Sequence, residues 1–169
     1  MMMARAEAKL ALRPFLPADA PLIAEIFRAS IAELTGDDYS AAQQEAWAAA
    51  ADDEAAFAAR LADAVTLLGT IDGSPVGFAS LAGTERLDML YVHPAAAGQG
   101  VGTMLLDALE RLARSRGAAR LTADVSDSAQ DFFRRRGFSP RQRNSVPVGG
   151  EWLANTTMEK QLAAKERAQ

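Results

Sequence analysis

Three alternating glycines give this chain its clearest chemical signal. Gly98, Gly100 and Gly102 follow an apolar segment that ends in Leu-Tyr-Val-His-Pro, and an amphipathic segment begins directly after them. The first N–H groups of a helix have no partner inside the helix, and the helix dipole is positive at that end. Glycine has no side chain to keep a phosphate away from the backbone. The pattern therefore predicts a phosphate or pyrophosphate group bound by main-chain amides.

Three other interpretations of the glycines are possible. A P-loop needs Gly-Lys-Ser/Thr, whereas Thr103 and Met104 follow Gly102. A dinucleotide-binding fingerprint needs a third glycine where this chain has Thr103 or Leu105, and it belongs to a first βαβ unit, whereas these glycines come late. Considered alone, the three glycines are equally compatible with a phosphate site and with a turn that only links a strand to a helix.

The hydrophobic pattern predicts the elements that must position this turn. A strand at 87–92 leads into it, and a helix over 100–116 follows. Asp72-Gly73 between two apolar runs predicts a hairpin of strands 65–71 and 76–81. Further predicted elements are strands at 10–15, 120–125 and 151–159, and helices at 20–34, after Ser40, after Asp52 and at 128–136. This order predicts one mixed α/β domain over 10–162 between flexible tails at 1–9 and 163–169.

The composition narrows the chemistry further. The 169 residues include no cysteine, which excludes a disulfide, a thiolate nucleophile and a Cys-based zinc site. His93 is the single histidine, so a His-rich metal site is excluded and no metal is expected. The net charge is −4, and the arginines between 134 and 143 are weak evidence for nucleic acid. Without a long apolar run, we expect a soluble cytoplasmic protein with no membrane or nucleic-acid partner.

The order of motifs after residue 86 decides between these interpretations. A strand ending in Leu90-Tyr-Val-His-Pro precedes Gly98-Gln-Gly-Val-Gly102, and Leu121-Thr-Ala-Asp-Val precedes Ala129-x-x-Phe-Phe-x-x-x-Gly-Phe138. In these motifs the chain resembles the GNAT superfamily of N-acetyltransferases over about 10–162. The resemblance implies an α/β (α+β) fold with a mixed, mostly antiparallel sheet of six or seven strands, flanked by about four helices.

The resemblance also implies the coenzyme site. Acetyl-coenzyme A (acetyl-CoA) would lie between two splayed strands, with the main chain at Leu90, Tyr91 and Val92 bonding its acetyl and pantetheine groups. Ser128 and Phe133 would belong to the same site. The pyrophosphate would be held by the amides of Gly98, Gln99, Gly100, Val101, Gly102 and Thr103.

The expected reaction is direct transfer of the acetyl group to a primary amine. The chain has no cysteine and no evident Ser–His pair that could form an acyl-enzyme intermediate. The acceptor stays open between a polyamine, an antibiotic, an amino acid and a protein N-terminus. Dimers are common in the family, so the oligomeric state stays open between monomer and homodimer. The alternative function is a non-catalytic module that binds or senses acyl-CoA, and a nucleotide-binding domain is a weaker one.

Three departures from the family pattern bear on the mechanism. Ala97 stands where the family often has an Arg or Gln, so a side-chain contact to the pyrophosphate is expected to be absent. Phe133 stands where many members have a tyrosine that protonates the departing thiolate, and a phenyl ring has no proton to give. Ser126 stands where Asn is common. Water, Ser126 or Ser128 would then supply the proton.

The attacking amine must lose a proton, because a lysine-like amine has a pKa of about 10.4. Asp88 is two residues before Leu90, so the two side chains are expected on one strand face, with the carboxylate near the acetyl group. The alternative is an Asp88 that faces solvent or pairs with Arg86. Glu85 is a weaker candidate on the other face, and His93 is interpreted as a strand-end residue.

Aromatic residues between the first helices are candidates for the acceptor wall. Tyr39 and Trp47, with neighbouring carboxylates, would suit a cationic amine. The alternative places Trp47 in the core. Trp152 is expected to be a core residue.

Overall fold

The computed structural model describes residues 7–162. The predicted tails at 1–9 and 163–169 therefore lie outside the described residues, apart from residues 7–9. Lys9 is bonded twice to Asp72, with both donor–acceptor distances at 2.9 Å, so ordered contacts begin at Lys9 or earlier. Across residues 7–162, no helix combines the length and the apolar character that crossing a bilayer requires. The same residues contain no group of three His, Cys, Asp or Glu side chains that could hold a metal ion.

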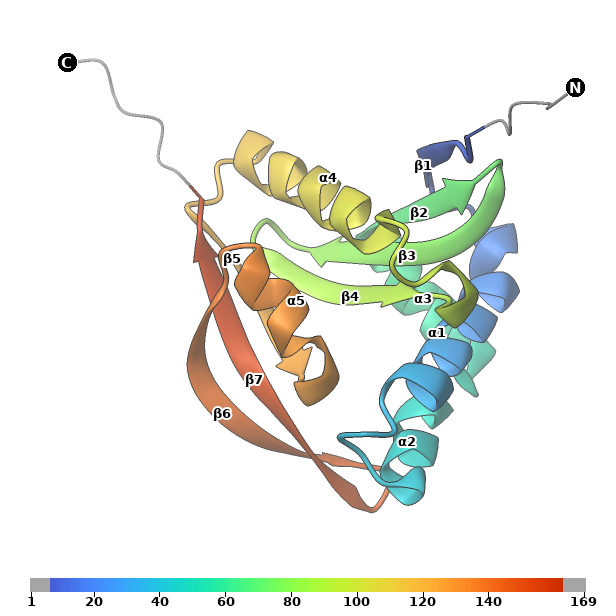
Figure 1. Cartoon of the computed structure of the whole chain (residues 1–169), viewed down its shortest axis with the longest axis vertical. Coiled ribbons are helices and arrows are strands. Elements are labelled where there is room, and N and C mark those ends of the chain that lie inside the picture. Colours follow the sequence, from blue (N-terminus) through green and yellow to red (C-terminus); the bar gives the residue numbers. More distant parts are fainter. Residues whose placement is uncertain (1–6, 163–169) are drawn as a thin grey trace, which may run out of the picture.

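One seven-stranded sheet organises the chain, in the order β1-β2-β3-β4-β5-β7-β6 (Figure 1). Its strands are β1 (Leu10–Pro14), β2 (Val65–Ile71), β3 (Ser74–Ala82), β4 (Arg86–Val92), β5 (Arg120–Ser126), β6 (Ser139–Val148) and β7 (Glu151–Gln161). Every neighbouring pair is antiparallel except β4 and β5, which are parallel. The predicted mixed, mostly antiparallel sheet is thus confirmed.

Helices cover both faces of the sheet and create two cores. They are α1 (Ala20–Leu34), α2 (Ala41–Ala48), α3 (Glu54–Asp63), α4 (Val101–Ser115) and α5 (Gln130–Arg135), with short 3-10 turns η1 to η4 between elements. The described residues thus contain five α-helices, one more than the expected four. Apolar residues of α1 and α3 pack against one face. Those of α4 and α5 pack against the other.

The structure contains the helices and the hairpin that local sequence signals predict. Ser40 caps α2: its hydroxyl accepts the Gln43 N–H at 3.1 Å, and the Gln43 side chain accepts the Ser40 N–H at 2.8 Å. Asp53 caps α3 by accepting the Ala56 N–H at 3.0 Å. Asp72 and Gly73 take φ values of 50° and 85° in the turn between β2 and β3, as a two-residue hairpin requires.

The sheet opens between its two parallel strands. β4 and β5 pair only at Arg86 with Thr122 and at Leu87 with Ala123. Beyond these pairs the strands separate, and Figure 1 shows the two halves of the sheet diverging on either side of α5. The splay implied by the family resemblance is therefore present.

A bulge in β4 corrects the expected placement of Asp88. In the pairing of β3 with β4, Ser80 lies opposite Met89 and Leu81 opposite Leu87, so Asp88 has no partner. Such an extra residue shifts the side-chain alternation. Leu87 and Leu90 therefore share the core beneath α4, whereas Asp88 bonds to Arg60 of α3 on the opposite face. The expectation that Asp88 and Leu90 share a face, or that Asp88 pairs with Arg86, is wrong.

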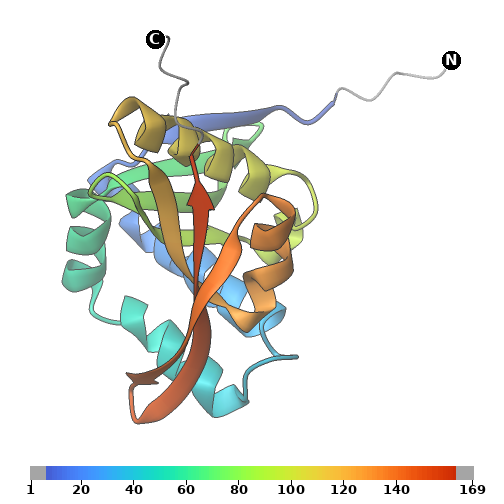
Figure 2. The same cartoon turned by 90° about the vertical axis from the view of Figure 1, so that its left-hand side faces the viewer.

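The hairpin of β6 and β7 reaches past the rest of the sheet to α2 (Figure 2). Trp152 lies just after its Gly149-Gly150 turn and is 63% exposed, so the expectation of a core tryptophan is wrong. The physical reason is its place at the hairpin tip, beyond the helices that cover the sheet. There the Trp152 carbonyl accepts a bond from the Gln43 side chain at 2.8 Å.

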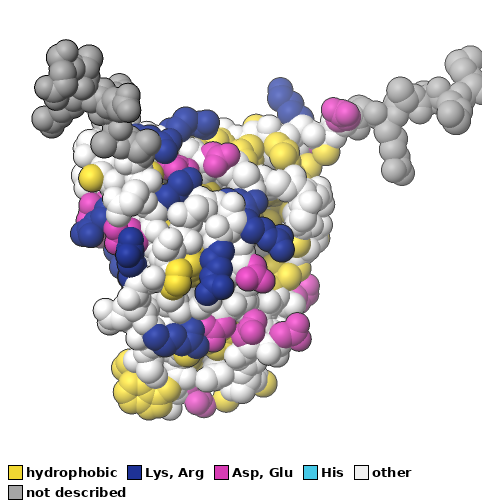
Figure 3. Space-filling view, turned by 60° about the vertical axis from the view of Figure 1, so that its left-hand side comes forward, with side chains coloured by type: hydrophobic (Ala, Val, Ile, Leu, Met, Phe, Trp, Pro, Cys, Tyr) yellow, Lys and Arg dark blue, Asp and Glu magenta, His cyan; other side chains and the backbone are white. Residues whose placement is uncertain are grey.

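The arginines of the C-terminal half do not form a uniform basic surface. On the face drawn in Figure 3, lysine and arginine side chains alternate with acidic ones. Arg143 bonds to Asp127 at 2.9 Å, and Arg141 lies 3.8 Å from Glu159. Arg141 and Arg143 are therefore part of ion pairs with neighbouring carboxylates.

Candidate active site

The glycine turn ends in main-chain amides that have no backbone partner. Gly98 and Gly100 have φ values of +78° and +88°, which residues with a Cβ rarely adopt. The first helical bond of α4 runs from the Met104 N–H to the Gly100 carbonyl at 3.0 Å. The N–H groups of residues 101–103 make no backbone bond within the described chain. They point from a helix start, where an anion is favoured.

Three cavities with shared walls run from this turn into the opening of the sheet. The turn cavity, of about 410 Å³, is lined by Val92, Ala96, Ala97, Gly98, Gly100, Val101, Gly102, Thr103, Phe132 and Arg136. The central cavity, of about 220 Å³, is lined by Ser30, Leu34, Thr35, Trp47, Leu90, Tyr91, Val92, Gly102, Ser126, Ser128, Ala129, Phe132 and Phe133. The inner cavity, of about 80 Å³, adds Leu87, Asp88, Met89, Ala123, Asp124 and Val125 to residues of the central one. Shared walls join the three into one cleft.

Gly102 is needed for close packing in this cleft. A Cβ placed on it would lie 3.2 Å from two ring atoms of Phe132. The ring therefore packs directly on the backbone at the start of α4. Gln99, by contrast, turns its side chain back to the Ala95 carbonyl at 3.2 Å and does not line the turn cavity.

The main chain of β4 offers its free edge to the central cavity. The His93 N–H bonds to Val76 of β3 at 2.7 Å. Because N–H groups alternate in direction along a strand, Tyr91 also faces β3, while Leu90 and Val92 face the opening. Leu90 and Val92 can thus bond a linear ligand, as the resemblance implied. The expected main-chain role does not extend to Tyr91.

Tyr91 instead contributes its side chain. Its ring stacks on Phe78 with centroids 5.6 Å apart and meets Phe27 edge-on at 4.8 Å. Its hydroxyl oxygen accepts the Trp47 indole N–H at 3.2 Å. Burial raises the pKa of Tyr91 to about 12, so the phenol keeps its proton at neutral pH.

Trp47 and Tyr39, the two predicted acceptor residues, have different positions. Trp47 lines both the central and the inner cavity. Tyr39 lies behind it, with ring centroids 5.3 Å apart, and lines neither. The Tyr39 hydroxyl donates to the Ala154 carbonyl at 2.6 Å and accepts the Asp127 N–H at 3.0 Å. Burial raises the pKa of Tyr39, and its hydroxyl serves as a brace between elements.

Two carboxylates reach the inner cavity. Arg60 donates to both oxygens of Asp88, at 2.8 and 3.0 Å, and this bond raises the pKa of Arg60. Asp124 was not predicted from the sequence; it accepts from Arg86 at 3.2 Å and from the Thr157 hydroxyl at 2.7 Å. The sequence does mark Asp124, because it is the one charged residue among residues 121–125 of the predicted strand, whose other residues are apolar or carry a hydroxyl. Arg86 thus pairs with Asp124.

The other predicted residues lie along the far wall of the cleft. Ser126 ends β5 and lines the central and inner cavities, and among the described residues its hydroxyl makes no side-chain hydrogen bond. The Ser128 hydroxyl donates to Asp38 at 2.8 Å. Phe133 is 5% exposed and packs edge-on against Phe138, so it lines the cleft with carbon alone.

Two further candidates lie outside the cleft. Glu85 lies 3.4 Å from Arg120 and lines none of its three cavities. His93 accepts the Ala95 N–H on Nδ1 at 3.1 Å and caps the turn after β4. This geometry agrees with its interpretation as a strand-end residue.

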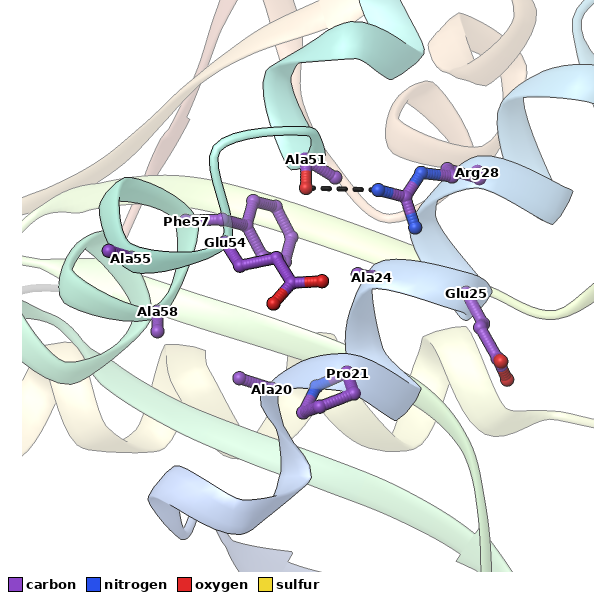
Figure 4. A pocket seen from close by; sticks show the side chains of 10 residues that line it. All are labelled: Ala20, Pro21, Ala24, Glu25, Arg28, Ala51, Glu54, Ala55, Phe57 and Ala58. Carbon is purple, nitrogen blue, oxygen red and sulfur yellow. Dashed lines mark hydrogen bonds between the residues drawn. The ribbon is translucent and has the colours of Figure 1, made fainter.

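A separate hollow of about 420 Å³ lies between α1 and α3 (Figure 4). Half of its lining residues are alanines, and Arg28 donates there to the Ala51 carbonyl at 3.0 Å. None of the residues predicted for catalysis or coenzyme binding lines it. The candidate active site is therefore the cleft at the strand opening.

Comparison with known proteins identifies the family to which this chain belongs. The family model described as an acetyltransferase (GNAT) domain matches residues 35–162. The uncharacterized N-acetyltransferase YafP of Escherichia coli K12 is 31% identical over 147 residues, which cover 87% of this chain and 93% of YafP. A GCN5-related N-acetyltransferase from Rhodopseudomonas palustris, known from a crystal structure, is 59% identical with a TM-score of 0.90, over 96% of this chain and 100% of that chain.

A more distant structure shares the fold. The putative acetyltransferase yncA of Salmonella typhimurium, solved with its cofactor acetyl-CoA, is 24% identical with a TM-score of 0.65, over 92% of this chain and 95% of that chain. The family match, the curated relative and the close crystal structure agree with the motifs around the glycine turn. The chain therefore belongs to the GNAT family of N-acetyltransferases.

Proposed function

We propose that this enzyme transfers an acetyl group from acetyl-CoA directly to a primary amine at the end of an unbranched chain. The observation that carries the proposal is the continuous cleft from the amides of the glycine turn, past the free edge of β4, to Asp88 and Asp124. One end suits a diphosphate and the other suits a cation.

The donor half of the cleft fits the coenzyme. When bound, acetyl-CoA supplies the acetyl group as an activated thioester. The amides of residues 101–103 would hold its diphosphate, and those of Leu90 and Val92 its pantetheine arm. An amide directed at the acetyl oxygen would stabilise the negative charge that develops there during attack.

The acceptor half favours a thin, positively charged group. The inner cavity measures only about 80 Å³, which suits an aminoalkyl end better than a ring. Asp88 and Asp124 are each paired with an arginine, but their oxygens keep lone pairs that could accept from the ammonium form, and Trp47 offers a ring face to it. Each Asp88 oxygen keeps a lone pair beyond its bond to Arg60. We therefore propose that Asp88 receives the amine proton through a water molecule.

The departing thiolate needs a different proton source from the family tyrosine. Phe133 has no polar atom, whereas the Ser126 hydroxyl reaches the same two cavities. We propose Ser126 as the proton donor. Replacing Phe133 with Tyr adds a second donor, and we expect kcat to rise in Phe133→Tyr if protonation of the thiolate limits turnover. An unchanged kcat means that this proton is not limiting.

Steady-state kinetics over an amine panel tests the proposal. We expect sequential kinetics, with turnover on polyamines or lysine-containing peptides. Asp88→Asn should lower kcat/KM by about 100-fold, the lower range for loss of a general base. The matched control is Glu85→Gln, because Glu85 lies outside the cleft. Coenzyme binding without turnover on any amine would instead support the alternative, a non-catalytic acyl-CoA-binding module.

The compartment follows from the donor. We propose that the transfer takes place in the cytoplasm, where acetyl-CoA is available. Separating the cell into fractions and assaying acetyl transfer in each would test this placement.

A further inference from the structure

An arginine from the other side of the cleft reaches the glycine turn. Arg136 directly follows α5, yet its side chain lines the turn cavity together with Ala97, Gly98 and Gly100. Ala97 has only a methyl group, so no side-chain contact to the pyrophosphate is expected from the sequence. The structure thus brings a cation to the place where the sequence shows none.

The side chain of Arg136 is held in a fixed orientation. Its Nε donates to the Thr103 hydroxyl oxygen at 3.1 Å, and Nη2 donates to the same oxygen. Its Nη1 donates to the Phe132 carbonyl at 3.0 Å. The guanidinium carbon lies 3.7 Å from the centroid of the Phe132 ring, and that ring packs on Gly102. Arg136 is therefore fixed to the start of α4 through two residues of the turn cavity.

This arrangement leaves part of the guanidinium available. Arginine has five N–H donors, and three are used here. The two that remain belong to Nη1 and Nη2, the pair that can bind a phosphate in a bidentate manner. Among the described residues, no carboxylate lies within salt-bridge distance of Arg136, whereas Arg60 and Arg143 are both paired. Its positive charge is thus uncompensated beside the turn.

We propose that Arg136 is the cation that binds the coenzyme pyrophosphate, in place of the side chain that is absent at Ala97. The proposal rests on the use of acetyl-CoA proposed above. Thr103 takes part as well. Its oxygen accepts from Arg136, which leaves the hydroxyl hydrogen to be donated to a phosphate oxygen.

Binding calorimetry with three ligands tests this role. Coenzyme A and dephospho-coenzyme A both contain the pyrophosphate, and pantetheine contains no phosphate. We expect Arg136→Gln to weaken binding of the first two equally, by about 10- to 100-fold, the range for a charge-assisted hydrogen bond. Pantetheine binding should not change. The control Arg135→Gln removes the same charge one residue away, on an exposed side chain outside the turn cavity, and should bind all three ligands like the wild type.

Two more variants separate binding from folding. Arg136→Lys keeps the charge but not the bidentate geometry, so its loss should be intermediate. Adding Ala97→Arg to Arg136→Gln should restore at least part of the lost affinity from the opposite side of the same cavity. Thermal unfolding of each variant checks that it is folded, and only folded variants enter the comparison.

Several outcomes would overturn the proposal. A loss confined to coenzyme A would assign Arg136 to the 3′-phosphate. An equal loss for pantetheine would give it only a packing role through Phe132. A wild type that binds coenzyme A beside an unchanged Arg136→Gln would refute this inference alone. A wild type that binds no coenzyme would refute the proposed function and this inference with it.

Discussion

The Tyr39 hydroxyl braces the site, and its removal has a calculable cost. Tyr39 is 5% exposed and makes bonds of 2.6 and 3.0 Å to Ala154 and Asp127. Tyr39→Phe keeps the ring but deprives both backbone groups of a partner. A hydrogen bond of this kind contributes about 1–1.5 kcal/mol, so we expect a loss of about 2–3 kcal/mol in the free energy of unfolding. For a chain of this size, that lowers Tm by about 4–12 °C.

The same change should affect the kinetics in a specific way. Asp127 begins the η4 turn, which carries Ser128 and Ala129 to the central cavity. Loosening this turn should raise KM for both substrates more than it lowers kcat. Differential scanning calorimetry and steady-state kinetics measure the two effects. Ser128→Ala is the control for stability alone, because its hydroxyl makes an exposed bond to Asp38 and its loss should change stability by at most about 0.5 kcal/mol.

One result would refute this reasoning. If Tyr39 bound the acceptor through its hydroxyl, Tyr39→Phe would raise the acceptor KM alone and leave Tm unchanged. That outcome would return Tyr39 to the acceptor wall predicted from the sequence.

Three other predictions concern the buried phenol of Tyr91, the backbone at Gly100 and the ion pair between Lys160 and Glu110. Folding raises the pKa of Tyr91 to about 12, so the stabilisation from its neutral phenol is complete below about pH 10 and disappears as pH rises through 12. Absorbance of tyrosinate should therefore appear only as circular dichroism shows unfolding, and earlier reversible ionisation of both tyrosines would contradict the burial. Gly100→Ala and Gly73→Ala should each lower the free energy of unfolding by about 1–2 kcal/mol, since a Cβ at positive φ costs this much. In calorimetry only Gly100→Ala should also weaken binding of coenzyme A, because a shift that relieves the strain moves the amides of the glycine turn. Lys160→Met removes a 2.8 Å ion pair from Glu110, which is 8% exposed, and urea unfolding should show a loss of about 1–3 kcal/mol.

The sequence predicted those parts of the fold that depend on neighbouring residues. The cap at Ser40, the start of a helix after Asp52 and the hairpin at Asp72-Gly73 use contacts within a few residues. The glycine turn is equally local, because positive φ and the amides at a helix start are properties of one short segment. The predicted positions of these features agree with the structure to within a few residues.

Features that depend on distant partners were not predictable in this way. The bulge at Asp88 arises from the pairing of β4 with β3, and a pattern of alternating residues cannot show where a register shifts. Trp152 lies at a hairpin tip whose reach depends on the arrangement of the whole sheet. Asp124 and Arg136 enter the site because β5 and α5 lie beside β4 and α4. Their positions need the assembled fold.

The short pairing between β4 and β5 also leaves unpaired backbone inside the sheet. The sheet has outer edges at β1 and β6, and the opening adds two unbonded backbone segments in its interior. Unpaired strand edges can recruit strands from other chains and lead to aggregation. A coenzyme molecule lying along β4 would cover one of these segments. On the proposed function, we therefore expect the enzyme to be less prone to self-association with coenzyme A than without it.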